Sequence, residues 1–330
     1  FPAFRSAPAA HDPPHSATRR EHIWAIMALT QPARPWFQTL CWFSVLSVGG
    51  LVVLGGVVRV TGSGLGCPDW PLCYGKILPP WEFKAVIEYS HRLTASALVG
   101  PLVLGTCIAA WITHRQDGWI VVPATVAIVL LIGQALLGGV TVLNELPGGV
   151  VAAHMALAQA LLGTLILLLV VSYRRPLLRI GTASPNRDDK GLDKLPMFML
   201  AAAAAVYGLM LTGSYVTAAG ATSACSTWPL CQGSLFPETG PQAIHMGHRL
   251  ATLVLGFYLM YALHLGFRGK DRPWVVKSLA MAASIILMLQ VAVGAATIWL
   301  DFAASIRALH LSLATALWGC TVGLATVTQT

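Results

Sequence analysis

Long apolar stretches alternate with short polar segments along most of the chain. Each stretch is about 20 residues or longer, the length that an α-helix needs to cross a hydrocarbon layer about 30 Å thick. Helices are the suitable elements, because open strands would leave backbone polar groups unpaired in lipid. The pattern predicts an all-α polytopic membrane protein with eight transmembrane helices, over Phe37–Val58, Lys84–Ile112, Trp119–Val140, Gly149–Tyr173, Pro196–Ala219, Ala243–Phe267, Ser278–Leu300 and Ala303–Val327.

The composition agrees with lipid as the solvent of this chain. Of its 330 residues 56% are hydrophobic and 10% are charged, and the mean hydropathy is +0.68. A soluble protein with so few polar residues could not cover its apolar core. The net charge of +8 is compatible with a nucleic-acid partner, but the placement of the basic residues argues for a role in membrane topology instead.

Basic residues collect in the segments on one side of the predicted membrane. An even number of spans places both termini on that side, and by the positive-inside rule it is the cytoplasmic side of a bacterial membrane. The cytoplasmic set comprises Arg5, Arg19, Arg20, Arg34, Arg115, Arg174, Arg175, Arg179, Arg187, Lys190, Lys194, Arg268, Lys270, Arg272 and Lys277, against Arg59, Lys76, Lys84 and Arg307 on the other side. Residues 1–36 are rich in Pro and Ala and are predicted to be a disordered cytoplasmic tail.

An internal repeat divides the chain into two halves. The segment Cys67-Pro-Asp-Trp-Pro-Leu-Cys73 recurs as Cys225-Ser-Thr-Trp-Pro-Leu-Cys231, and His91-Arg-Leu-Thr recurs as His248-Arg-Leu-Ala. The repeat predicts two four-helix bundles, residues 37–173 and 196–330, joined by a basic cytoplasmic linker over 174–195. Because each half has an even number of spans, the halves share one orientation, and a pseudo-two-fold axis along the membrane normal is expected.

Four histidines occupy matched positions near the outer ends of the even-numbered spans. They form two pairs, His91 with His154 and His248 with His310. Ionisable side chains in lipid are costly and usually functional, and imidazole is a common ligand of haem iron. Structural zinc sites usually need four Cys or His ligands, so one haem site in each half is the preferred interpretation.

The two halves differ next to these histidines. Glu88 lies three residues before His91, and His245 stands at the matching place in the second half. The difference predicts that the first half performs chemistry and the second holds a fixed cofactor. The alternative for Glu88 is a structural bond to a nearby Arg or to the backbone. For Arg92 and Arg249 two roles are open, contact with haem propionates or with lipid headgroups.

Paired cysteines lie in the first and fifth loops, on the predicted outer side. Cys67 and Cys73 match Cys225 and Cys231, and five intervening residues make a disulfide within each loop sterically reasonable. Bridges that shape the loops are the main interpretation. A redox-active first pair is the alternative.

With these motifs in place, the chain closely resembles the haem A synthase family. The resemblance covers roughly residues 37–327. It is carried by the paired-cysteine loops, by the helices that contain His154 and His310, and by the segments Glu88-Tyr-Ser-His91-Arg92 and His245-Met-Gly-His248-Arg249.

The resemblance implies roles for particular residues. Family histidines matching His248 and His310 hold a haem b cofactor, and the pair matching His91 and His154 faces the substrate haem. The glutamate matching Glu88 is implied to take part in catalysis. This division agrees with the difference between the halves that the repeat shows by itself.

The activity that the resemblance implies is oxidation of the C8 methyl of haem O to the formyl group of haem A, for cytochrome oxidase assembly. It also implies a disulfide between Cys67 and Cys73, an electron donor, and haem O synthase as a partner. We hypothesise successive oxidations through a hydroxymethyl and a hydrated aldehyde. The donor, the oxygen source and homo-oligomer formation stay open.

Three other functions compete with this one. A di-haem b-type cytochrome for quinol oxidation would use the same histidines, although transfer across the membrane requires haems at different depths. A membrane haem carrier would bind without forming product. A thiol oxidoreductase using the loop cysteines would leave the histidines unexplained.

Overall fold

The computed structural model describes residues 33–173, 194–269 and 272–329. Eight helices in this part of the chain are long and apolar enough to span a membrane, which confirms the predicted all-α class. They are α2 (Pro35–Val60), α3–α4 (Phe83–Thr113), α5 (Gly118–Leu143), α6 (Gly148–Tyr173), α7 (Leu195–Ala218), α8 (Gly240–Arg268), α9 (Trp274–Trp299) and α10 (Ala304–Val327). The predicted ends differ from these by four residues or fewer.

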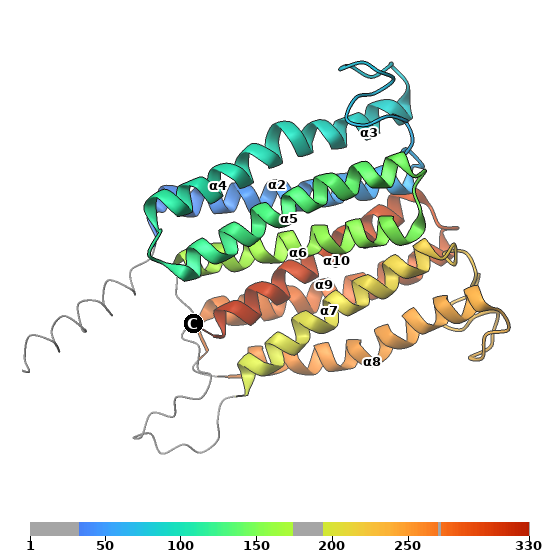
Figure 1. Ribbon diagram of the computed structural model, residues 1–330. Helices are drawn as coiled ribbons and strands as arrows, with labels where there is room; N and C mark the ends of the chain where they lie inside the picture. The colour runs from blue at the N-terminus through green and yellow to red at the C-terminus, as the bar shows by residue number, and fades with distance from the viewer. Residues whose placement is uncertain (1–32, 174–193, 270–271, 330) are drawn as a thin grey trace, which may run out of the picture.

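The helices form two groups that follow the two halves of the sequence (Figure 1). In the first group α6 packs on α2 and α5, and in the second α10 packs on α7 and α9. Across the groups α6 contacts α10, α2 contacts α10, and α6 contacts α7. Exchanging each helix for its repeat counterpart leaves this set of contacts unchanged, which is compatible with the predicted two-fold arrangement.

Helices α6 and α10 meet through residues that the repeat makes equivalent. The Gln159 side-chain amide donates to the Thr315 hydroxyl at 3.0 Å, and both side chains are buried. These residues are 156 positions apart, as are His154 and His310. The Trp318 indole N–H also donates to the Gln159 carbonyl at 2.9 Å. A contact between two equivalent positions of the repeat, such as Gln159 with Thr315, lies where a two-fold axis between the halves would pass.

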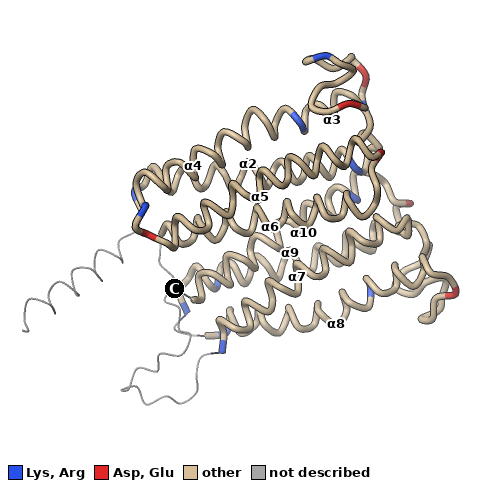
Figure 2. Tube along the Cα trace, in the orientation of Figure 1, with Lys and Arg blue, Asp and Glu red and all other residues tan. Residues whose placement is uncertain are grey.

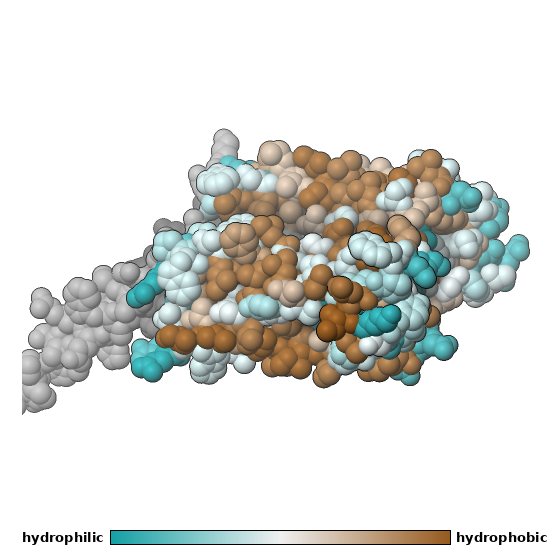
Figure 3. Space-filling view, turned by 90° about the horizontal axis from the view of Figure 1, so that it is seen from above, coloured by the Kyte–Doolittle hydropathy of each residue, from teal (hydrophilic) through white to brown (hydrophobic). Residues whose placement is uncertain are grey.

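Charged residues in the described part of the chain gather at the two ends of the helices (Figure 2). Between these ends the surface is largely apolar, as the brown area in Figure 3 shows. Buried side chains such as Phe37, Leu165 and Leu263 fill the interior of the bundles. The molecule therefore has the apolar belt expected of an integral membrane protein.

The predicted tail and linker fall mostly on residues outside the described ranges. The end of the predicted tail is ordered, because the Ala33 N–H donates to the Ser172 carbonyl at 2.8 Å and α2 begins at Pro35. Of the predicted linker, Lys194 is described and immediately precedes α7.

The second span contains a π-helical segment, Thr94–Val99, between α3 (Phe83–Leu93) and α4 (Gly100–Thr113). Pro101 follows it, and proline has no N–H and crowds the carbonyl four residues earlier. The Gly100 N–H bonds the carbonyl of Ala95, five residues back. The matching helix α8 is continuous over Gly240–Arg268, so this departure from α-geometry belongs to the first half alone.

Candidate functional site

The four predicted histidines lie at matching places in their helices. His91 and His248 are the ninth residues of α3 and α8, and His154 and His310 are the seventh residues of α6 and α10. At a rise of about 1.5 Å per residue, all four are about 9 to 12 Å from the start of their helices. The structure thus keeps them near one depth and near the same end of the bundle.

The histidines form one pair within each half. The His91 and His154 rings are near enough to interact electrostatically, and so are those of His248 and His310. The Nδ1 atoms of three of them, His91, His154 and His310, are buried without a hydrogen-bond partner among the described residues. A buried ring nitrogen without a partner is costly, so these rings are not explained by packing alone, and a neutral imidazole is a common ligand of haem iron.

A glycine on a neighbouring helix makes room for each ring. A Cβ atom at any of the four would come within 3.0–3.2 Å of the Cε1 atom of the facing histidine. The contacts pair Gly55 with His91, Gly138 with His154, Gly213 with His248 and Gly294 with His310. Since these glycines match each other across the repeat, the same cradle is built twice.

Glutamines contact the histidines of α6 and α10. The Gln134 amide nitrogen lies 3.2 Å from His154 Nε2, and that of Gln290 lies 3.3 Å from His310 Nε2. The Gln134 amide also donates to the His154 carbonyl at 3.0 Å. These side chains fix the ring orientation from the neighbouring helix in both halves.

Arg92 and Glu88 join the histidine helix to the first outer loop. Arg92 Nη1 donates to the carbonyls of Asp69 and Leu72 at 2.6 and 2.7 Å, and Nη2 donates to the Cys67 carbonyl at 2.7 Å. Nη2 also forms an ion pair with Glu88 Oε1, and the Cys67 N–H donates to Glu88 Oε2 at 2.8 Å. Glu88 is only 3% exposed, so the structural bonds considered for it are present.

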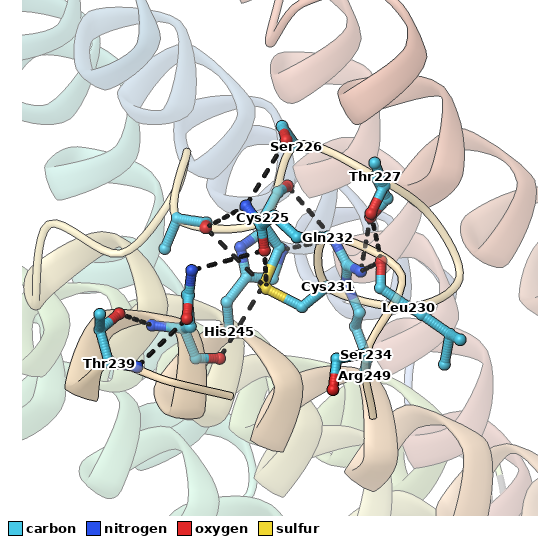
Figure 4. Close-up of a disulfide and its surroundings, with 12 residues drawn as sticks. Cys225, Ser226, Thr227, Leu230, Cys231, Gln232, Ser234, Thr239, His245 and Arg249 are labelled. Carbon is cyan, nitrogen blue, oxygen red and sulfur yellow. Dashed lines mark hydrogen bonds between the residues drawn. A yellow bond between two sulfur atoms is a disulfide. The ribbon is translucent and has the colours of Figure 1, made fainter. Parts of the chain in front are cut away.

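The second half repeats this arrangement with a neutral partner (Figure 4). Arg249 donates to the loop carbonyls of Cys225, Thr227, Pro229 and Leu230 at 2.8–3.4 Å. His245 Nδ1 lies 3.1 Å from the Ala221 carbonyl, which can only accept, so Nδ1 carries the proton. His245 Nε2 is then free to accept the long 3.5 Å contact from Arg249 Nη2.

Both outer loops are closed by the disulfides considered from sequence, Cys67–Cys73 and Cys225–Cys231. In the first loop the Asp69 carboxylate accepts from the N–H groups of Tyr74 and Gly75 at 2.6 and 2.7 Å. The Gly75 hydrogen bond is the main cause that holds the pKa of Asp69 below its usual range. The bridges and the arginines together fix each loop over the start of its histidine helix.

Comparison with known proteins identifies the family. The model for cytochrome oxidase assembly proteins matches residues 38–83 and 81–322. The heme A synthase of Halalkalibacterium halodurans is 33% identical over 227 residues, covering 67% of this chain and 73% of the relative. The chain belongs to the haem A synthase family. The heme A synthase of Exiguobacterium sp. is 29% identical over a longer stretch, covering 84% of this chain and 88% of the relative.

Haem is the ligand that membership of the haem A synthase family suggests, and the residues present fit it. Each half supplies a facing histidine pair, and buried ring nitrogens without partners occur in both pairs. The glycine cradle leaves each imidazole close to a neighbouring backbone, so the ring is held in place. In the described ranges no three His, Cys, Asp or Glu residues are grouped closely enough to hold a metal ion.

A cavity of about 450 Å³ lies elsewhere, between the two halves. It is lined by apolar residues of α6, α7 and α10 that include Gly163, Leu200 and Trp318, and none of the four histidines lines it. This cavity is therefore separate from the two histidine pairs.

The glycines beside the histidines and the loop contacts of the arginines were not predicted from the sequence. The glycines carry a signal, because Gly55 and Gly213 are 158 residues apart and Gly138 and Gly294 are 156 apart, like the neighbouring motifs. The sequence contains no signal for the arginine contacts, because these contacts depend on the folded path of each loop. Arg92 and Arg249 donate to loop carbonyls, a role beyond the two that sequence analysis had considered.

The glycine cradle predicts an effect of a single methyl group. Gly213→Ala places a Cβ 3.2 Å from His248 Cε1, so the ring must move by a few tenths of an ångström. We expect about tenfold faster loss of the haem held by that half, the lower end of effects from groups that orient a ligand. Gly208→Ala on the same helix is the control, since nothing lies within 4 Å of its Cβ. Equal haem release from both variants would contradict the cradle.

Proposed function

We propose that this chain is a haem A synthase that oxidises the C8 methyl of haem O to the formyl group of haem A. The observation that carries the proposal is the pair of repeat-matched, buried histidine pairs at one depth, in a chain of the haem A synthase family. Because both pairs lie at a common depth, haems bound by them would suit transfer between the halves better than transfer across the membrane.

The two halves take different roles in this proposal. His91 and His154 bind haem O as substrate, and His248 and His310 hold a resident haem b. The difference between Glu88 and His245 supports this division, because the two occupy equivalent positions and only the first half has a carboxylate at that position. The π-helical segment Thr94–Val99 is a second feature of the first half without a counterpart.

The chain itself supplies orientation, exclusion of water and a proton acceptor. Arg92 neutralises Glu88 and holds the first loop against α3, so the loop covers the histidine end of the half. Each oxygen of the Glu88 carboxylate accepts one of the hydrogen bonds described above and keeps further lone pairs. Glu88 can therefore accept protons released as the methyl group is oxidised. The haem b supplies a path for electrons when it is bound.

The proposal extends to topology and partners. Both termini lie on the cytoplasmic side of a bacterial membrane, supported by the excess of Arg and Lys in residues 1–34 and 174–194. Haem O synthase is the expected source of the substrate, and a separate electron partner is required.

Expression in bacteria that make haem O but lack haem A synthase tests the function. We expect haem A, or its hydroxylated precursor, in haems extracted from cells carrying the chain, measured by chromatography and mass spectrometry. Haem O left unchanged, with haem b at about two per purified chain, would instead identify a di-haem electron carrier.

A further inference from the structure

A threonine on α7 contacts the ring of one of the four histidines. The Thr212 hydroxyl oxygen lies 2.7 Å from His248 Nδ1. The same hydroxyl donates to the Leu209 carbonyl at 2.8 Å. Thr212 is the residue before Gly213, whose missing side chain makes room for the same ring. Two adjacent residues of α7 therefore set both the place and the orientation of His248.

The two hydrogen bonds of Thr212 decide which ring nitrogen of His248 carries the proton. A hydroxyl has one proton to donate, and the Leu209 carbonyl can only accept. The Thr212 oxygen therefore accepts from His248 Nδ1–H. A neutral imidazole protonated at Nδ1 has its lone pair at Nε2, so the fold presents Nε2 of His248 as the ligand nitrogen.

The first half lacks this hydrogen bond. Gly213 matches Gly55, and the residue before Gly55 is Leu54, which has no hydroxyl. His91 Nδ1 is buried, and within the described ranges it has no hydrogen-bond partner. The rings of His91 and His248 thus lie in equivalent glycine cradles, but only the second ring has an acceptor at Nδ1.

From this difference we infer that Thr212 is a positioning residue that makes the second-half site retain its haem, while Leu54 leaves the first-half site able to release one. The inference rests on the proposed function, in which haem b stays and the reacted haem leaves. An acceptor at the second ring nitrogen of a metal-bound histidine fixes the ring and makes it a stronger ligand, and loss of such a partner typically weakens metal binding about 10- to 100-fold.

The test uses the purified protein with its haem b bound and three variants. Thr212→Val removes the hydroxyl and keeps the shape, and Thr212→Ser keeps the hydroxyl. The matched control is Thr252→Val, because the Thr252 hydroxyl donates at 2.8 Å to the backbone carbonyl of His248 and not to its ring. The readouts are the midpoint potential of the haem, from a redox titration of its absorbance, and the rate of haem transfer to excess apomyoglobin.

We expect Thr212→Val to raise the midpoint potential, because a weaker histidine ligand stabilises ferric iron less. Haem loss should become about tenfold faster or more. Thr212→Ser should restore both values, and Thr252→Val should behave as the unaltered protein. Equal values for Thr212→Val and Thr252→Val, or a Thr212→Ser variant that resembles Thr212→Val, would overturn the inference.

A reciprocal variant and a ligand variant complete the test. Leu54→Thr offers His91 the missing acceptor and is expected to slow release of haem from the first half, and unchanged release would count against the inference. His248→Ala tests the underlying site separately. If it retained haem b, the assigned site itself would be wrong. If it lost haem b while Thr212→Val had no effect, the site would stand and only the role of Thr212 would fall.

Discussion

Replacing Glu88 by Gln is expected to lower the rate of haem A formation by about 10²-fold or more, with haem b still bound and haem O accumulating. A general acid or base contributes about 10² to 10⁴ to a reaction rate. The amide keeps the size of the side chain and an oxygen that can accept from the Cys67 N–H, so the loop should keep its place. What the variant loses is the charge, the hydrogen bond that the second carboxylate oxygen accepts from Arg92, and the capacity to take up a proton.

The matched control for this variant lies in the second half. His245 occupies the equivalent position beside Arg249, and His245→Gln is expected to leave the rate of haem A formation nearly unchanged. The measurement is the amount of each haem extracted from cells at fixed times after induction. Unchanged turnover in Glu88→Gln, with both haems bound, would remove Glu88 from the chemistry and leave it a structural role.

Replacing Arg92 by Leu should cost more stability than replacing Arg249 by Leu, by about 3 kcal/mol or more. Both variants lose hydrogen bonds to loop carbonyls. Arg92→Leu also leaves the Glu88 carboxylate, 3% exposed, without its counter-charge, and breaking a buried ion pair costs about 3–5 kcal/mol. His245 is neutral, so Arg249→Leu leaves no buried charge without a counter-charge. Unfolding of the purified protein in detergent measures the difference.

A double variant separates the charge from the lost loop contacts. In Arg92→Leu with Glu88→Gln the buried group is neutral, so part of the lost stability should return. Hydrogen exchange at the amides of residues 67–76 should rise in Arg92→Leu and fall partway back in the double variant. If the two arginine variants were equally destabilised, the ion pair would not be what distinguishes the two loops.

The fold could be predicted from hydropathy because crossing lipid sets a minimum length for every span. The largest error, at Trp274, arose because α9 begins four residues before the apolar core of its segment. Trp and Lys residues are well suited to the edge of the membrane, so a helix can extend past the residues that hydropathy identifies. The π-helical segment was not predicted, although Pro101 within a long span is a signal for a local departure from α-geometry.

The histidine pairs could be predicted from the repeat, since matched spacing places equivalent residues at equal depth. The contacts that distinguish one histidine from another could not be predicted in the same way. Thr212 reaches His248 from a different helix, and the repeat aligns positions without showing which helix faces are opposed. The arginine contacts depend on the folded path of the loops, so Arg92 was assigned to propionates or headgroups, and its hydrogen bonds to loop carbonyls were missed.

We propose that the first half binds the haem that reacts and that the second half holds the haem that stays. The direct measurement is the haem content of purified His91→Ala and His248→Ala, expressed in cells that make haem O and compared with the unaltered chain. His91→Ala is expected to retain haem b and to form no haem A, whereas His248→Ala is expected to lose haem b. Loss of haem b in His91→Ala with retention in His248→Ala would reverse the assignment, and haem A formed by both variants would contradict it.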